Sequence, residues 1–227
     1  MGGRGSKSGV IQQATPRTTI PLSFKQLTQD EADPIFDDME DQYDINTIQA
    51  INQYIRMDQQ ANGFTMSQNM NHKLENDIPL NANEQYVADH LTNAMHALGQ
   101  DVVLTRAAHK DFLEALGVSN YQNMSTAQLD AAVKGAEYTE KKFVSAAIDP
   151  KKNPFITGPV SGGREVFIHI KTPASTKCVM GNRQQSEVIL GRGVKFRATG
   201  AHFDGSTAYP RSGGSLPRVI VEVEIVH

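Results

Sequence analysis

Residues 183–193 read RQQSEVILGRG, and they place polar groups at the edge of a short apolar strand. The apolar run from Val188 to Leu190 is closed by two glycines around an arginine, a pattern typical of a buried strand bounded by a turn. Gln185 and Glu187 lie two positions apart, so we expect them to project from the same side of that strand. A carboxylate beside an amide can stabilise a cation that develops during a reaction, because the carboxylate supplies negative charge and the amide orients a partner. A lone Gln-x-Glu is also typical of a strand end that faces water. Other stretches of the sequence must decide between a catalytic pair and a solvent-exposed strand end.

Length and composition limit the classes of protein that the chain can belong to. A chain of 227 residues is long enough to bury a sizeable core, and 39% hydrophobic residues with a net charge of -3 are values of a globular protein. This charge balance does not indicate a large nucleic-acid footprint, and no apolar run is long enough to cross a membrane. We therefore expect a monomer with neither nucleic acid nor membrane as a partner.

The first residues and the single cysteine bear on location. Residues 1–19 are rich in Gly, Ser, Thr and Arg, which predicts a flexible basic arm, and residues 20–227 are expected to form one domain. The arm lacks the apolar segment of a secretory signal, so we expect a cytoplasmic protein, or one that a phage or a dedicated export system delivers to a host cell. Cys178 is the only cysteine, which excludes an intrachain disulfide; we interpret it as a strand filler rather than a nucleophile.

The N-terminal half has the pattern of helices. Acidic residues fill the stretch 30–44 with apolar residues at helical spacing between them, typical of a solvated helix that packs on one face; no metal site is expected there. Asn83 is expected to cap an amphipathic helix that ends at Gly99, and Ser125 starts a capping box. The remaining helices are expected from residue 46 to 55, as one short helix within 59–83, and at 107–116.

The C-terminal half has the pattern of strands. Val166, Ile168 and Ile170 alternate with longer polar or aromatic residues, which predicts a half-buried strand. Further strands are expected at residues 101–106, 143–147, 188–190, 194–199 and 219–226. Because the helices precede most of the strands, the sequence predicts an α+β fold with the helices segregated from the sheet.

Three marks follow one another in a fixed order: a strand that ends in Arg106, a strand that carries Ser145, and the pair Gln185-x-Glu187. This order resembles the Arg, Ser, Glu class of mono-ADP-ribosyltransferases, which includes clostridial Rho-modifying exoenzymes and related domains of binary toxins and phage proteins. The resemblance spans roughly residues 80–200, and EVILGRG closes the last motif much as EVLLPRG does in relatives. It implies an ADP-ribosyltransferase-like mixed sheet behind N-terminal helices.

The resemblance also implies a role for each matching residue, with NAD as the substrate. Arg106 and Arg164 would contact the NAD phosphates, which a planar guanidinium can bind bidentately. Ser145 would hydrogen-bond the catalytic glutamate, which is Glu187. Gln185 would sort acceptors, since relatives with glutamate there modify arginine and relatives with glutamine modify asparagine in Rho-type GTPases.

The sequence departs from the family pattern at several positions. Ala146 and Ala147 follow Ser145 where the family has a threonine and a second serine. Ser161 stands where relatives often carry an aromatic residue, and Phe155 is a candidate to replace it. The stretch 177–185, interpreted as the acceptor-recognition turn, lacks the aromatic residue that some relatives use to grasp a GTPase.

The resemblance therefore implies transfer of ADP-ribose from NAD to a protein acceptor residue other than arginine, with an asparagine-type acceptor favoured and a host protein or GTPase as candidate partner. Cleavage of the nicotinamide–ribose bond passes through an oxocarbenium-like state that a carboxylate stabilises. Preorganised electrostatics of this kind are worth roughly 3 to 4 kcal/mol per group. Two alternatives stay open: a NAD glycohydrolase, and a non-catalytic, virion-associated binding module that kept the fold.

Overall fold

The computed structural model describes residues 24–61, 63–158, 162–210 and 213–226. The expected basic arm at residues 1–19 and position Ser161 lie outside these ranges. The helices are α1 (Gln29–Glu40), α2 (Ile45–Ile55), α3 (Met66–Glu75), α4 (Ala82–Asn93), α5 (Asp111–Ala115), α6 (Thr126–Val133) and α7 (Pro154–Thr157), with 3-10 turns η1 (Tyr121–Asn123), η2 (Pro150–Lys152) and η4 (Arg183–Gln185). The strands are β1 (His96–Ala97), β2 (Val102–Ala108), β3 (Glu137–Thr139), β4 (Val144–Ala147), β5 (Val166–Thr172), β6 (Lys177–Met180), β7 (Glu187–Leu190), β8 (Lys195–Ala208) and β9 (Leu216–Val226).

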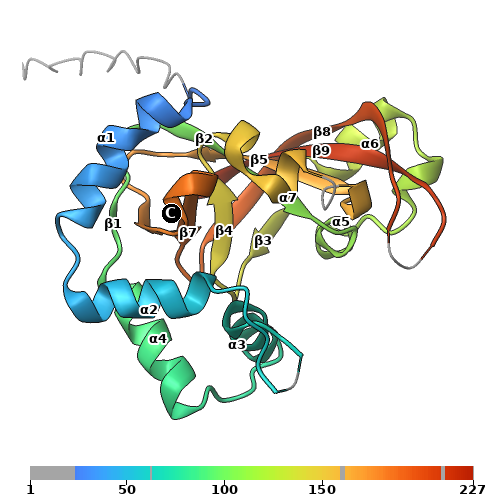
Figure 1. Cartoon of the computed structure of the whole chain (residues 1–227). Coiled ribbons are helices and arrows are strands. Elements are labelled where there is room, and N and C mark those ends of the chain that lie inside the picture. The colour runs from blue at the N-terminus through green and yellow to red at the C-terminus, as the bar shows by residue number, and fades with distance from the viewer. Residues whose placement is uncertain (1–23, 62, 159–161, 211–212, 227) are drawn as a thin grey trace, which may run out of the picture.

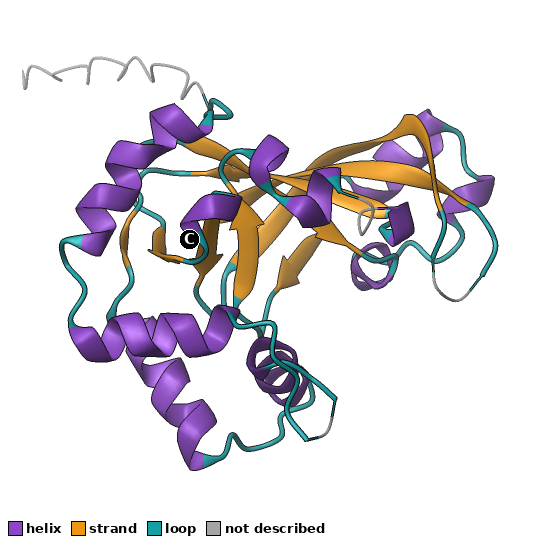
Figure 2. Cartoon of the chain, viewed as in Figure 1, coloured by secondary structure: helices purple, strands orange, loops and turns teal. Residues whose placement is uncertain are grey.

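The described strands form one mixed sheet in the order β1-β6-β7-β4-β2-β5-β9-β8-β3, in which β5 and β9 pair in parallel and the other neighbours are antiparallel. Figures 1 and 2 show α2, α3 and α4 grouped beside the end of the sheet that holds β1, β6 and β7, with α5 and α6 at the other end. The predicted α+β class is confirmed.

Two groups of buried side chains hold the helices to the sheet. The larger one joins alternate residues of β5, β8 and β9 to α1, α5 and α6; the predicted alternation at Val166, Ile168 and Ile170 is confirmed, since all three are buried. The smaller one joins α2, α3 and α4 to β6 and β7, where Tyr54 and Leu91 pack with Ile189. Burial of apolar side chains is the main stabilising contribution of such a layer. The N-terminal helices are thereby fixed against the strand that carries Glu187.

Helix caps decide where several helices begin. The capping box that starts at Ser125 is confirmed, and the acidic stretch forms α1 as expected. The prediction for α4 was wrong at both ends. Asn81, not Asn83, caps it, because the Asn81 side chain accepts from the Glu84 amide at 2.9 Å and the Glu84 carboxylate accepts from the Asn81 amide at 2.8 Å. The helix ends at Asn93 because the chain then forms β1 against β6.

Pairing within the sheet overrides local patterns at three further places. The helix expected at 107–116 is only α5, since β2 continues to Ala108, opposite Val166. Residues 177–180, interpreted as part of a turn, form β6 against β7. Strand β8 runs on to Ala208 because β9 pairs with it over nearly its whole length. Within the described residues, no helix is long and apolar enough to cross a membrane.

Candidate active site

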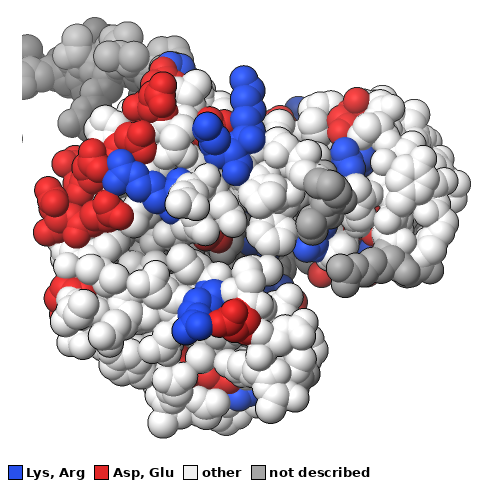
Figure 3. All heavy atoms as spheres, in the orientation of Figure 1, with Lys and Arg blue, Asp and Glu red and all other residues white. Residues whose placement is uncertain are grey.

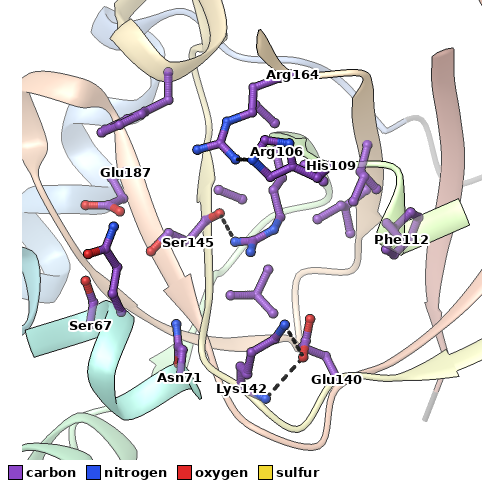
Figure 4. A pocket seen from close by; sticks show the side chains of 18 of the residues that line it. Ser67, Asn71, Arg106, His109, Phe112, Glu140, Lys142, Ser145, Arg164 and Glu187 are labelled. Carbon is purple, nitrogen blue, oxygen red and sulfur yellow. Dashed lines mark hydrogen bonds and ion pairs between the residues drawn. The ribbon is translucent and has the colours of Figure 1, made fainter. Parts of the chain in front are cut away.

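A cavity of about 810 Å³ lies where β2, β4 and β7 meet the loops that follow α2 and precede β5. Its size falls in the range of ligand pockets. The five residues singled out from the sequence all line it: Arg106, Ser145, Arg164, Gln185 and Glu187. Figure 4 shows Ser145 between Glu187 and the guanidinium of Arg106, with Arg164 beside His109 above them. Side chains separated by up to 81 positions in the sequence therefore share one hollow.

Glu187 is the first residue of β7, and the turn before it fixes its carboxylate. The amide of Asn182 donates to Oε2 of Glu187 at 2.9 Å, and the amide of Gly181 donates to the Glu187 main-chain oxygen at 2.9 Å. A Cβ added at Gly181 would lie 2.5 Å from Oε2, so only glycine leaves room for the carboxylate in this position. The turn thus supplies both a donor and the space that the carboxylate needs.

Burial raises the pKa of the Glu187 carboxyl above its ordinary value. Three groups oppose that shift by favouring the carboxylate: the Asn182 amide, a hydrogen bond from the Ser145 side chain, and the positive charge of Arg106. Ser145 lies opposite Ile189 in the β4–β7 ladder, which sets its side chain diagonal to Glu187 on the same face. A half-buried carboxylate that directed donors hold in place is suited to stabilise a nearby positive charge.

The expected placement of Gln185 on the strand was wrong. Gln185 ends the 3-10 turn η4, and Ser186 after it has left-handed backbone geometry with φ of 53°. Ser186 is fully buried; its hydroxyl accepts from the Asp149 amide at 3.2 Å and its carbonyl from the Ile148 amide at 2.9 Å. These bonds offset the cost of the left-handed conformation, which an L-residue other than Gly, Asn or Asp rarely adopts. Gln185 nevertheless reaches the cavity, from a turn instead of from the strand.

Arg106 lies within β2 rather than at its end. Its Nη1 donates to the main-chain oxygen of Ser145 at 2.8 Å, across to the neighbouring strand β4 (Figure 4). The guanidinium is therefore fixed to the same short strand that carries the serine. This contact joins two of the predicted site residues directly.

Sequence reasoning missed the side chains around Arg164, which precedes β5. Its guanidinium contacts Nε2 of His109, and Nδ1 of that histidine lies 2.9 Å from the carboxylate of buried Glu165. Because a guanidinium only donates, Nε2 must accept and Nδ1 must carry the proton that Glu165 accepts. His109 follows Arg106 by three positions, but nothing in the sequence pairs it with Glu165, 56 positions later.

The cavity is also lined by polar residues of the helical layer that the sequence analysis did not single out. The Asn71 amide on α3 donates to the hydroxyl of Tyr54 at 3.1 Å, and its oxygen accepts from the Phe143 amide at 3.3 Å. Tyr54 is fully buried, and burial raises the pKa of its phenol, so it stays neutral. Asn71 thereby ties the helical layer to the start of β4.

The sequence profile described as ADP-ribosyltransferase exoenzyme matches residues 23–209, which is most of the chain. The chain belongs to this family. The exoenzyme is accordingly an NAD-dependent ADP-ribosyltransferase, and the resemblance drawn from the sequence is confirmed. Family membership favours an enzyme over the non-catalytic binding module. No curated protein matches it at the level of sequence.

Solved structures share the fold of the exoenzyme at low sequence identity. Plx2a, an ADP-ribosyltransferase toxin from Paenibacillus larvae, is 14% identical with a TM-score of 0.66, over 90% of this chain and all of that one. C3stau2 from S. aureus, solved with NAD, is 16% identical with a TM-score of 0.61, over 90% of this chain and 99% of that one. The enzymatic component C2-I of the Clostridium botulinum C2 toxin is 12% identical with a TM-score of 0.63, and the exoenzyme covers 49% of its length.

Two further residues that the sequence analysis discussed, Phe155 and Cys178, lie in different surroundings. Phe155 on α7, the candidate to replace the aromatic residue that relatives often carry at the position of Ser161, lines the cavity, and its role stays a prediction. Cys178 is fully buried in β6, and burial raises the pKa of its thiol to about 12. A thiol with that pKa is not a nucleophile at neutral pH. Within the described residues, no group of three or more His, Cys, Asp or Glu side chains could hold a metal ion.

Proposed function

We propose that the exoenzyme cleaves the nicotinamide–ribose bond of NAD at Glu187 and transfers ADP-ribose to a protein acceptor residue other than arginine, with asparagine favoured. The observation that carries this proposal is the Glu187 carboxylate, which the Asn182 amide orients within a cavity that also contains two arginines. The ribose and nicotinamide end of NAD lies against Glu187, and the diphosphate lies toward Arg106 and Arg164.

The cavity offers a negative charge to the ribose, which becomes positive in the reaction, and positive charges to the phosphates of NAD. As nicotinamide leaves, positive charge spreads over the ribose ring, and the carboxylate of Glu187 stabilises it. An ionised group that is already oriented needs no reorganisation when the charge develops, and it contributes roughly 3 to 4 kcal/mol to lowering the barrier. The guanidinium of Arg106 pairs with phosphate oxygens and limits the movement of NAD, so the scissile bond stays beside Glu187.

Gln185 is the residue proposed to select the acceptor. It lines the cavity within the same turn as the amide that holds Glu187. A carboxamide can donate one hydrogen bond to an asparagine side chain and accept one from it, whereas it cannot accept a proton from an arginine guanidinium. This arrangement favours a neutral amide acceptor on a host protein or GTPase.

The test compares the wild-type protein with Glu187→Gln and Gln185→Glu, a matched pair that exchanges a carboxylate and an amide in opposite directions. Each is incubated with labelled NAD, with and without a cell lysate. We expect Glu187→Gln to lower nicotinamide release by about 10²- to 10³-fold. We expect Gln185→Glu to keep NAD cleavage and to move label to arginine. Equal release from Glu187→Gln and wild type contradicts the proposal.

One feature favours a second function, NAD glycohydrolysis. Strand β6 takes up residues 177–180, so the turn that faces an acceptor is short and contains no aromatic side chain. A short polar turn gives few contacts to a protein, and water then competes as acceptor. Free ADP-ribose with no labelled protein in any lysate would assign this function instead.

A further inference from the structure

The acidic helix α1 contacts the turn that precedes Glu187 through one arginine. Acidic side chains cover α1 in Figure 3, and the sequence pattern alone is that of a solvated helix. Three of these carboxylates instead pair with Arg183 of η4: Asp33 at 3.2 Å, Asp37 at 2.7 Å and Glu40 at 2.9 Å. They are spaced by four and three positions, so they share one face of the helix. The face of α1 that bears them is therefore a binding surface for Arg183.

The guanidinium is also placed by a ring beneath it. Its Cζ lies 5.9 Å from the ring centroid of Phe36, which is fully buried in the same helix. Nε and Nη2 of Arg183 both donate to Oδ1 of Asp33, at 3.3 and 3.2 Å, while Nη1 faces the other two carboxylates. Only a planar, branched cation can make all of these contacts at once. Lysine offers a single ammonium and cannot replace it.

Two further contacts link the same turn to the start of α1 and to the segment just after its end. Before the turn, the amide of Met180 donates to the hydroxyl of Tyr43 at 2.8 Å. After it, the Asp149 carboxylate accepts from the amide of Gln29 at 3.0 Å, while the Asp149 amide donates to the hydroxyl of Ser186. Residues 180–186 are thus attached to α1 directly through Arg183, to its first residue through Asp149, and to the segment that follows it through Tyr43.

The turn bears two groups that face the cavity, and Arg183 lies between them. Asn182 provides the amide that orients the Glu187 carboxylate, and Gln185 lines the cavity itself. The side chain of Arg183 is not among the cavity's lining residues; it extends to α1. A change at Arg183 therefore reaches the reaction only through its neighbours.

We propose that Arg183 is a positioning residue of the exoenzyme: its attachment to the acidic face of α1 sets the orientation of Glu187 through the Asn182 amide, and the position of Gln185. This inference rests on the proposed role of Glu187. It gives α1 a function in the reaction, although none of the carboxylates on that face lines the cavity.

The two ends of NAD are held by separate parts of the molecule, and the test uses this separation. Arg106 lies on β2 and Arg164 precedes β5, whereas the ion pairs of Arg183 are with residues of α1. Loss of the Arg183 contacts should thus displace the Glu187 carboxylate without weakening the binding of the NAD diphosphate. A displacement of about 1 Å at a reacting group can cost on the order of 10²-fold in rate.

The experiment measures kcat and KM for nicotinamide release by Arg183→Lys, Asp37→Asn and the double variant. Arg197→Lys is the matched control, since Arg197 on β8 pairs with Glu137 and Glu224 away from the cavity. We expect Arg183→Lys to lower kcat by about 10- to 100-fold with KM for NAD within about twofold of wild type. We expect Asp37→Asn to lower kcat less, and the double variant to match Arg183→Lys because both changes act on one contact. Arg197→Lys should keep wild-type kcat.

The outcomes separate this inference from the proposed function. An active wild type with an unchanged kcat in Arg183→Lys overturns the inference, as does a raised KM with unchanged kcat, which would mean that Arg183 binds NAD. Additive losses in the double variant also overturn it. Failure of Glu187→Gln to lower release overturns the role of Glu187 instead. If Arg183→Lys does not fold, Asp37→Asn alone provides the comparison of kcat with KM.

Discussion

The guanidinium of Arg106 donates to the main-chain oxygen of Ser145 at 2.8 Å, so two of the residues that define the sequence pattern touch across neighbouring strands. One of the five N–H groups fixes the side chain, and a guanidinium has others to offer to the phosphates that Arg106 is proposed to bind. Strand β4 thus joins Ser145, whose side chain hydrogen-bonds Glu187, to the guanidinium of Arg106 on β2. This four-residue strand therefore contacts both the carboxylate and the guanidinium that are proposed to act on NAD.

We expect Arg106→Lys to raise KM for NAD by about 10- to 100-fold, because a hydrogen bond to a charged group contributes roughly 1.5 to 3 kcal/mol. A lysine ammonium cannot keep the bond to the Ser145 oxygen and also pair bidentately with phosphate. Initial rates of nicotinamide release over a range of NAD concentrations measure the change. Arg197→Lys is the control for a like exchange elsewhere on the sheet; an unchanged KM in Arg106→Lys would show that Arg106 does not bind NAD.

We expect Gly181→Ala to abolish most NAD cleavage while the protein stays folded. The new Cβ would meet Oε2, Cδ and Cγ of Glu187 at 2.5 to 2.8 Å, so the carboxylate must leave its place beside the Asn182 amide. The loss should approach that of Glu187→Gln, about 10²-fold or more. Gly162→Ala is the matched control, since no atom lies within 4 Å of a Cβ built there. Wild-type kcat in Gly181→Ala would mean that Glu187 works from another rotamer.

The sequence predicted those features that depend on neighbouring residues. Alternation along β5, the capping box at Ser125 and the helical spacing in the acidic stretch were read correctly because each is a local property of the chain. The five site residues share a cavity, as their ordered motifs suggested. Their chemical roles stay predictions until the variants above are measured.

Apart from the local cap of α4 by Asn81, the features that escaped prediction depend on partners far along the chain. Gln185 left the strand because Ser186 turns into the left-handed region, held there by Ile148 and Asp149, 38 and 37 positions earlier. The contact of Arg183 with α1 spans 143 positions or more, and charge pattern alone could not distinguish it from a solvated acidic face. β6 was missed because four residues gain strand structure only by pairing with β7.

We expect Cys178 to be inert toward thiol reagents in the folded exoenzyme. Its pKa is raised to about 12 by burial, so almost no thiolate forms at pH 7 to 8. NAD cleavage should therefore survive incubation with iodoacetamide. Cys178→Ser should lower the free energy of unfolding by about 1 to 3 kcal/mol, because it buries a hydroxyl among apolar side chains. Cys178→Ala tests the loss of sulfur packing alone; inhibition of native protein by iodoacetamide would contradict the burial of this thiol.

We expect Glu187→Gln to raise the melting temperature at pH 7 to 8, even though it removes activity. Burial raises the pKa of the Glu187 carboxyl in the folded protein. The protonated form is thus favoured by folding, and the stability that this contributes is present below the unfolded pKa of about 4.5 and lost as pH rises through the folded pKa. Glutamine stays neutral and does not incur this loss. Buried functional charges commonly cost stability in this way.

The measurement is the melting temperature of both proteins from pH 4 to 8, where 1 kcal/mol corresponds to roughly 2 to 4 °C for a chain of this size. The advantage of Glu187→Gln should grow as pH rises and vanish near pH 4. Glu114→Gln is the matched control, because Glu114 is an exposed carboxylate paired with Lys110 on α5, and such pairs contribute little. A variant that is less stable than wild type at pH 8 would mean that the hydrogen bonds from Asn182 and Ser145 outweigh burial, which would reverse the electrostatic balance inferred for this carboxylate.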